Sequence, residues 1–219
     1  MKKRIVLLAV LVIAGVLLAA YGPTLLGFYR LQRHIDETAL ADDADGGPWP
    51  RASDVCVTCH GVKGNSLNDA YPSLASQPAQ YVAAQLQAFA AGRRANPTMG
   101  PLAMTMSAAE IARVADYYAK QTPPENRYFK PDARLRATGE QLVTGGACAA
   151  CHGARLMGHA QFPRLAGQGY DYLRAQLDAF ASGARSEATG TMQRVAQAMS
   201  ADDRAAVATY LASLGPVKQ

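Results

Sequence analysis

Beyond residue 34 the chain has no excess of positive charge, although its formal net charge is +5. Five basic residues lie on either side of one apolar segment near the N-terminus: Lys2, Lys3, Arg4, Arg30 and Arg33. The remaining lysines and arginines equal the 17 acidic residues in number. Because a basic face is the first requirement for binding nucleic acid, this balance excludes a nucleic-acid-binding protein.

The alternation of apolar and polar residues that is typical of strands is also lacking, and apolar residues recur at helical spacing instead. Two such segments end at Gly92 and Gly183, residues suited to a left-handed C-terminal cap. The pairs Ser107/Glu110 and Ser200/Asp203 predict capping boxes at the starts of two later helices. The sequence therefore predicts an all-α fold.

Cysteines and histidines are few, with four of each, and every cysteine belongs to one of two motifs. The motifs are Cys56-Val57-Thr58-Cys59-His60 and Cys148-Ala149-Ala150-Cys151-His152. This pattern is typical of c-type haem attachment, in which two thiols bind the vinyl groups and the histidine is the proximal iron ligand. Two structural disulfides or a zinc site are the alternatives for two Cys-x-x-Cys pairs. We interpret the motifs as the sites of two covalent haems c.

The N-terminal segment has no charged residue between positions 5 and 29. At 1.5 Å per residue this length of helix crosses a hydrocarbon core of about 30 Å. The preceding basic residues place the N-terminus in the cytoplasm. A cleaved secretory signal is the alternative, with Ala20 and Gly22 at suitable positions, but Pro23 would follow the scissile bond. We predict an uncleaved single-pass anchor in a bacterial inner membrane, with the rest of the chain in the periplasm.

An internal repeat divides the remainder of the chain into two copies of one domain. The expected segments are an anchor with its flank (1–34), an acidic tether rich in Gly and Pro that includes Trp49 (35–50), domain 1 (51–121), a linker with prolines (122–132) and domain 2 (133–219). The repeat pairs these residues: Pro72/Pro163, Gln77/Gln168, Tyr81/Tyr172, Gln85/Gln176, Phe89/Phe180, Arg94/Arg185, Met99/Met192 and Met106/Met199.

Methionine is the better candidate for the sixth iron ligand, because the only other histidines are His34, beside the anchor, and His159, close to His152 in sequence. A Met ligand also gives cytochromes c their raised potential. Met106 and Met199 directly precede the capping serines, where an apolar residue often packs as a hydrophobic staple. Met99 and Met192 are expected in loops with no helical face to fill, so we favour these two as ligands.

The two copies resemble the dihaem cytochrome c4 family over residues 54–215. The shared motifs are Cys-x-x-Cys-His, Pro-x-Leu-Ala, Gln-x-x-x-Tyr, Phe-x-x-Gly-x-Arg, a Met and Ser-x-x-Asp/Glu. The resemblance implies tandem class I cytochrome c domains, each a small helical fold around one haem. It implies the same axial methionines, Met99 and Met192.

The resemblance also implies that the carbonyls of Pro72 and Pro163 accept the proximal histidine N–H, which would fix the imidazole tautomer. Arg94 and Arg185 are expected either to neutralise haem propionates or to be solvated side chains at helix ends. Domain 2 has a predicted helix before its haem motif, and the resemblance implies that this helix packs through Gly139 on the last helix, near Tyr210. The matching part of domain 1 is rich in proline, so we expect the first haem to be more exposed.

The implied function is single-electron transfer between respiratory-chain partners, such as a quinol-oxidising complex, a dehydrogenase or a terminal oxidase. The alternatives are a haem enzyme, either a peroxidase or an oxidase of sulfur compounds, and the haem subunit of a dehydrogenase complex. An enzyme needs an open iron position and nearby acid/base groups. The chain has no spare distal histidine and too few clustered carboxylates for such a set, so we predict a carrier with no catalytic residues.

Overall fold

The computed structural model describes residues 2–44, 46–47, 51–123, 125–126 and 129–215. These residues fall into two compact units, with the boundary between Arg51 and Ala52.

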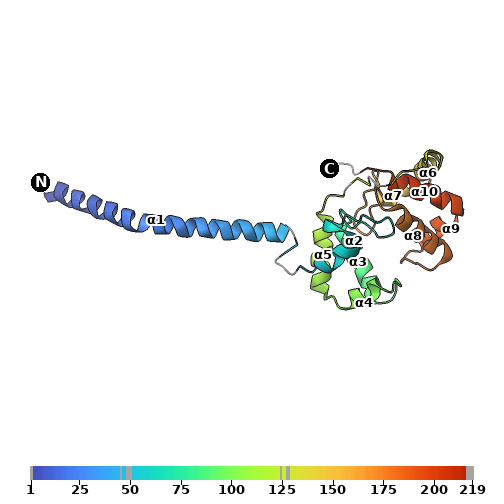
Figure 1. Ribbon diagram of the computed structural model, residues 1–219, viewed down its shortest axis with the longest axis horizontal. Coiled ribbons are helices and arrows are strands. Elements are labelled where there is room, and N and C mark those ends of the chain that lie inside the picture. Colours follow the sequence, from blue (N-terminus) through green and yellow to red (C-terminus); the bar gives the residue numbers. More distant parts are fainter. Residues whose placement is uncertain (1, 45, 48–50, 124, 127–128, 216–219) are drawn as a thin grey trace. The chain divides into compact units, whose positions relative to one another are not determined.

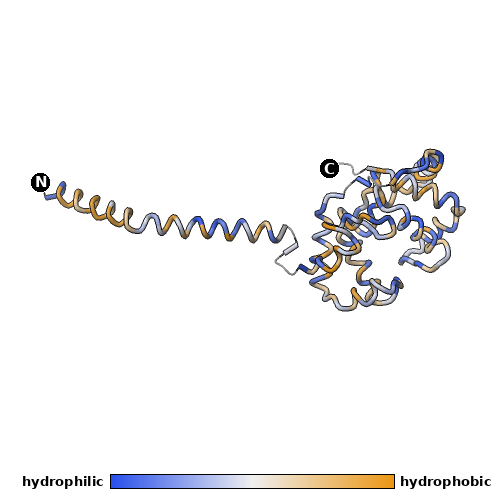
Figure 2. The backbone as a smooth tube through the Cα atoms, viewed as in Figure 1, coloured by the Kyte–Doolittle hydropathy of each residue, from blue (hydrophilic) through white to orange (hydrophobic). Residues whose placement is uncertain are grey.

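The first unit is dominated by one long helix, α1 (Lys2–Ala44), which contains Pro23. Figure 2 shows that its early turns are apolar and its later turns polar. The polar turns carry i,i+4 pairs, Gln32 with Asp36 and Arg33 with Glu37, which support a helix in water. The acidic segment assigned to the tether is therefore helical as far as Ala44. The part of the tether around Trp49 lies outside the described residues.

Among the described residues, α1 is the one helix whose length and composition would let it cross a membrane, and a secretory signal has the same properties.

The second unit consists of short helices and loops, with no strand among its described residues (Figure 1). The repeat accounts for most of its elements, because α2, α3, α4 and α5 of domain 1 correspond to α7, α8, α9 and α10 of domain 2. Domain 1 contains 3₁₀ turns η1 (Asp54–Cys56) and η2 (Val62–Gly64) and helices α2 (Val57–His60), α3 (Ala79–Ala90), α4 (Met99–Met104) and α5 (Ala108–Ala119). Domain 2 contains α6 (Ala133–Gly145), α7 (Cys148–His152), α8 (Tyr170–Ser182), α9 (Thr191–Gln197) and α10 (Ala201–Ala212). The predicted all-α fold is confirmed.

Local signals in the sequence explain where these helices begin and end. Both capping boxes are formed: the Ser107 N–H donates to Glu110 at 2.8 Å, and the Ser200 N–H donates to Asp203 at 3.0 Å. The glycine after α8, Gly183, has a φ of +78°, a left-handed conformation that glycine adopts without a Cβ penalty.

Each domain has a small apolar core of its own. In domain 1, Val82 and Leu86 of α3 pack with Ile111, Val114 and Tyr118 of α5. The core of domain 2 is built from the corresponding helices and is extended by α6: Val143, Leu173, Leu177, Val207 and Leu211.

Helix α6 packs closely on α10, as predicted, and has no counterpart among the helices of domain 1. The approach depends on Gly139, because a Cβ at this position would overlap the carbonyl oxygen of Ala206 and the side chain of Tyr210. The helix–helix contact in domain 2 is therefore possible only with a glycine there.

Candidate functional site

The two Cys-x-x-Cys-His motifs form short helical turns at matching places in the two domains. Cys56 ends η1, Cys59 and His60 belong to α2, and α7 holds all of the second motif. None of the four cysteines forms a disulfide, and all four are half-buried. Burial raises the pKa of the Cys56 and Cys148 thiols.

Each motif histidine is held by a backbone carbonyl from the following loop. His60 Nδ1 lies 2.8 Å from the Pro72 oxygen, and His152 Nδ1 lies 2.9 Å from the Pro163 oxygen. A carbonyl only accepts hydrogen bonds, so Nδ1 must carry the proton and Nε2 keeps its lone pair. Burial lowers the pKa of both histidines, against the opposing effect of the carbonyl bond. Each ring is therefore neutral and presents a free Nε2 for an iron.

The favoured methionines are not in loops, which corrects the structural premise behind their choice. Met99 is the first residue of α4, and Met192 lies in the first turn of α9. The unpaired N–H groups of these short helices are capped by side chains: Met99 N–H donates to Asn96 at 2.8 Å, and Met192 N–H donates to Glu187 at 3.0 Å. The sequence reading missed these two caps, and with them the helices.

The methionine side chains fall into two groups by environment. Met99 and Cys56 both pack on the domain 1 core, and Met192 and Cys148 both pack on the domain 2 core. Met106 and Met199 also contact these cores, directly before the capping boxes. Met104 is 71% exposed, which rules it out as a buried ligand.

The two remaining histidines lie where a sixth ligand is not expected. His34 is on the exposed polar part of α1. His159 belongs to the loop after α7, and its ring lies 5.3 Å from the ring of Phe162, which also contacts His152. This loop also supplies the Pro163 carbonyl, so His159 lies on the proximal side of His152.

Arg94 and Arg185 are not solvated side chains at helix ends. Both are half-buried at the contact between the two domains. Arg94 donates to Gln85 of its own domain at 2.8 Å and to Gln176 and Tyr172 of the other domain at 2.9 and 3.0 Å. Arg185 forms the mirror-image set with Gln176 at 2.6 Å and with Tyr81 and Gln85 at 3.2 Å. The two guanidinium groups thus join the domains, and these described partners are neutral.

The sequence did not predict that a second set of polar residues is buried at this contact. Arg164 is only 1% exposed and donates to the carbonyls of Ser73, Ala75 and Ala166. Burial lowers the pKa of its guanidinium to about 10, so it stays charged at neutral pH. Gln77 and Gln168 are also buried there. The sequence signal for Arg164 was weak, because it occupies the variable position of the Pro-x-Leu-Ala motif.

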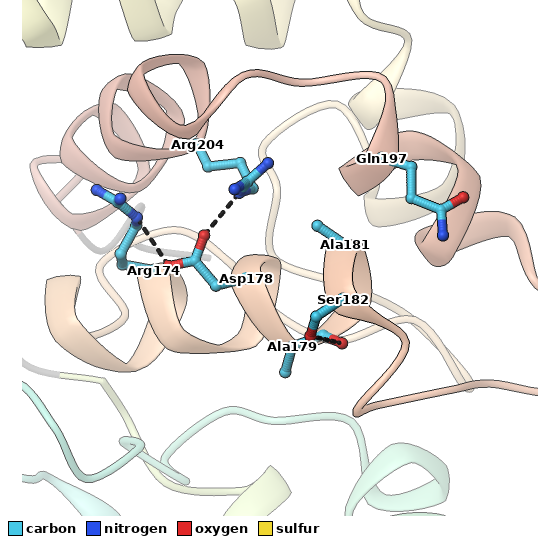
Figure 3. A pocket seen from close by; sticks show the side chains of 7 residues that line it. All are labelled: Arg174, Asp178, Ala179, Ala181, Ser182, Gln197 and Arg204. Atoms are coloured by element: carbon cyan, nitrogen blue, oxygen red, sulfur yellow. Dashed lines mark hydrogen bonds and ion pairs between the residues drawn. The ribbon is translucent and has the colours of Figure 1, made fainter.

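A hollow of about 690 Å³ lies among α8, α9 and α10 (Figure 3). Asp178 lies there between Arg174 and Arg204, at 3.0 and 2.6 Å. The residues that line this hollow include no cysteine, histidine or methionine. It is therefore separate from the candidate haem sites.

The residues at each motif fit a covalently attached haem. Each domain offers two free thiols, a neutral imidazole with a free Nε2 and a thioether side chain on the same apolar core. This donor set is that of a Met/His cytochrome c.

Comparison with known proteins gives matches over most of the chain. A family model described as cytochrome c matches residues 137–215, and one described as cytochrome c oxidase, cbb3-type, subunit III matches residues 49–117. A thiosulfate dehydrogenase electron acceptor from Thiomonas intermedia (strain K12) is 39% identical over 74% of this chain and 81% of its own length. Cytochrome c4 from Thiocapsa roseopersicina is 38% identical over 75% of this chain and 89% of its own length.

A solved structure shows the same fold. The crystal structure of reduced recombinant cytochrome c4 from Pseudomonas stutzeri has a TM-score of 0.70 at 31% identity, and the match covers 80% of this chain and 98% of that one.

Proposed function

The chain belongs to the cytochrome c4 family of dihaem electron carriers, and from that premise we propose that it accepts electrons from a dehydrogenase and passes them singly to a respiratory-chain partner. The observation that carries the proposal is the duplicated set of residues: each domain contains a carbonyl-bound motif histidine and a half-buried methionine packed on its core. When bound, each haem supplies one one-electron site. Two such sites suit a protein that receives the electrons of a dehydrogenase.

The proposed attachment and ligands are the same in the two domains. Cys56 and Cys59 hold the first haem, with His60 and Met99 on its iron. Cys148 and Cys151 hold the second, with His152 and Met192. Support comes from the proton on each Nδ1, which directs Nε2 to the metal, and from the caps that fix the backbone at both methionines.

Arg94 and Arg185 are proposed to stabilise the negative charge of the haem propionates. Two half-buried guanidinium groups with neutral hydrogen-bond partners leave positive charge at the contact between the domains. Anions are the natural complement of such a charge, and a guanidinium binds carboxylates well.

The location is proposed to be the periplasmic face of the inner membrane, with α1 as an uncleaved anchor. Support comes from the length and apolar character of α1 and from the basic residues before it. Sequencing the mature N-terminus tests this. A start at Tyr21 or Pro23 would assign the segment to a cleaved signal.

The proposed donor is a thiosulfate dehydrogenase, because the relative from Thiomonas intermedia is described as the electron acceptor of that enzyme. The test mixes the oxidised full-length protein, in detergent, with a thiosulfate dehydrogenase and thiosulfate and follows haem absorbance. We expect both haems to be reduced, and no reduction when the dehydrogenase is left out. Reduction by thiosulfate alone, or rapid carbon monoxide binding to the reduced protein, would point to an enzyme with an open iron position instead.

A further inference from the structure

The peptide bond that follows each proline of the Pro-x-Leu-Ala motif is hydrogen-bonded at both ends. The Pro72 carbonyl accepts from His60 Nδ1 at 2.8 Å, and the N–H of the same peptide unit, that of Ser73, donates to Gln168 Oε1 at 2.7 Å. Gln168 belongs to domain 2, whereas His60 belongs to domain 1. The histidine of one domain is thus connected through one peptide group to a glutamine of the other.

The second copy repeats this connection in the opposite direction. The Pro163 carbonyl accepts from His152 Nδ1 at 2.9 Å, and the N–H of Arg164 donates to Gln77 Oε1 at 3.0 Å. The histidine here is in domain 2 and the glutamine in domain 1. Each domain therefore supplies the glutamine that completes the proximal side of the other.

Each glutamine amide is fixed in orientation and kept from water. The amide oxygen of each glutamine accepts from a backbone N–H, and its amide nitrogen donates to the carbonyl of that same residue. Gln168 donates to Ser73 at 3.0 Å, and Gln77 donates to Arg164 at 2.9 Å. A flipped amide would place a donor against an N–H, so the oxygen must face the peptide. Gln77 is 4% exposed and Gln168 is 2% exposed. The low exposure keeps both connections in a region of low dielectric.

Hydrogen bonds in such a chain polarise one another. An acceptor on the peptide N–H makes the carbonyl at the other end a stronger acceptor. A stronger acceptor at Nδ1–H raises the basicity of the ring as a metal ligand. A more basic ligand stabilises ferric iron over ferrous iron and so lowers the reduction potential.

We propose that Gln77 and Gln168 are positioning residues that act across the domain contact, each lowering the reduction potential of the haem in the other domain. This inference rests on the proposed haem ligation by His60 and His152. One electron enters each iron on reduction, and no proton moves along the connection. Each haem is therefore linked, through one hydrogen-bonded peptide group, to a glutamine of the other domain.

The experiment replaces each glutamine by leucine in the full-length two-haem protein and measures the potential of each haem by an NMR-monitored redox titration. Gln77→Leu should raise the reduction potential of the second haem by about 28 mV and change that of the first haem less. At 59 mV per tenfold, this is about a threefold change in the one-electron equilibrium constant. Gln168→Leu should do the reverse. Loosening of the domain contact would instead expose both haems and move them together.

Gln121→Leu is the matched control, because Gln121 is half-buried in domain 1 and its side chain donates at 2.9 Å to the Tyr117 carbonyl, which belongs to neither connection. It should change neither potential. A second readout uses ¹⁵N-labelled histidine in the reduced protein. The Nδ1–H signal of His152 should move in Gln77→Leu, and that of His60 should move in Gln168→Leu.

Equal shifts at both haems, shifts confined to the glutamine's own domain, or unchanged potentials would overturn the inference. If a leucine variant fails to assemble, Gln77→Glu and Gln168→Glu decide, since each keeps an oxygen acceptor. If the potential falls more at the haem of the other domain than at the haem of the glutamine's own domain, the inference is supported. Equal changes at the two haems overturn it. Failure of the proposed function would appear earlier, as an unmodified protein whose mass shows fewer than two haems.

Discussion

Domain 1 and domain 2 share their helices but differ in what surrounds them. Domain 2 has α6 packed on α10 through Gly139, and the buried Arg164 stands where domain 1 has Ser73. The motif histidines are nevertheless equally buried, at 7% for His60 and 6% for His152. The two motif histidines are therefore equally buried although only domain 2 has α6. The contact between the domains lies beside both sites, whereas α6 enlarges the core of domain 2 alone.

Gly139→Ala tests how far domain 2 depends on α6, and we expect the largest effect here. The added methyl group would force α6 away from α10, lowering the free energy of unfolding of domain 2 by about 3 kcal/mol. Hydrogen exchange should show faster opening of α10 with α5 unchanged. Gly145→Ala, on the same helix with no atom near the added Cβ, should have little effect. Equal loss of protection in α5 and α10 would show that the domains unfold as one unit.

Met99→Ala and Met192→Ala test whether the two domains use the same ligand set. Each substitution should lower the reduction potential of its own haem by at least about 120 mV, which is a hundredfold change in the one-electron equilibrium constant, because the thioether favours ferrous iron. A spectroelectrochemical titration of each variant measures this. Met104→Ala and Met106→Ala are the controls and should cost only packing. An iron–sulfur charge-transfer band that survives in Met99→Ala or Met192→Ala would contradict the assignment.

Arg164→Met tests the asymmetric charge at the domain contact. The variant loses hydrogen bonds to the carbonyls of Ser73, Ala75 and Ala166, and we expect a loss of about 2 kcal/mol in the free energy of unfolding. Ser73→Ala removes the side chain of the matching residue of the other copy, whose hydroxyl accepts from Ser66 N–H at 3.2 Å, and should cost less. Denaturant unfolding of both variants measures the difference. Equal costs would mean that the buried charge does not hold the domains together.

Asp178→Asn should have the smallest effect, confined to domain 2. Burial alone would raise the pKa of the Asp178 carboxyl, but hydrogen bonds from Arg204 and Arg174 outweigh it and leave the pKa below its ordinary value. The stabilisation is therefore present above a pH of about 4 and is lost as the pH falls through the folded pKa. Because the side chain is 42% exposed, we expect less than about 1 kcal/mol. Unfolding measured from pH 3 to pH 6, with the exposed Asp171→Asn as control, tests this; a loss that does not shrink in acid would contradict it.

Short-range chemistry decided what the sequence could predict. The Cys-x-x-Cys-His spacing, the capping boxes at Ser107 and Ser200 and the left-handed Gly183 each depend on residues a few positions apart. The Pro72 and Pro163 carbonyls and the match of Gly139 to Tyr210 came from the family resemblance. The sequence alone thus predicts an all-α, two-domain, dihaem carrier.

Only the tertiary structure decided how the two copies meet. The repeat named Gln77, Gln168, Arg94 and Arg185 as paired residues, but nothing local shows that each one bonds to the other domain. Arg164 had no visible role, because its partners are backbone carbonyls, which every residue carries and no sequence pattern marks. Contacts between distant segments depend on the packing of whole domains, and this is why the hydrogen bonds between the two domains could not be predicted from the sequence.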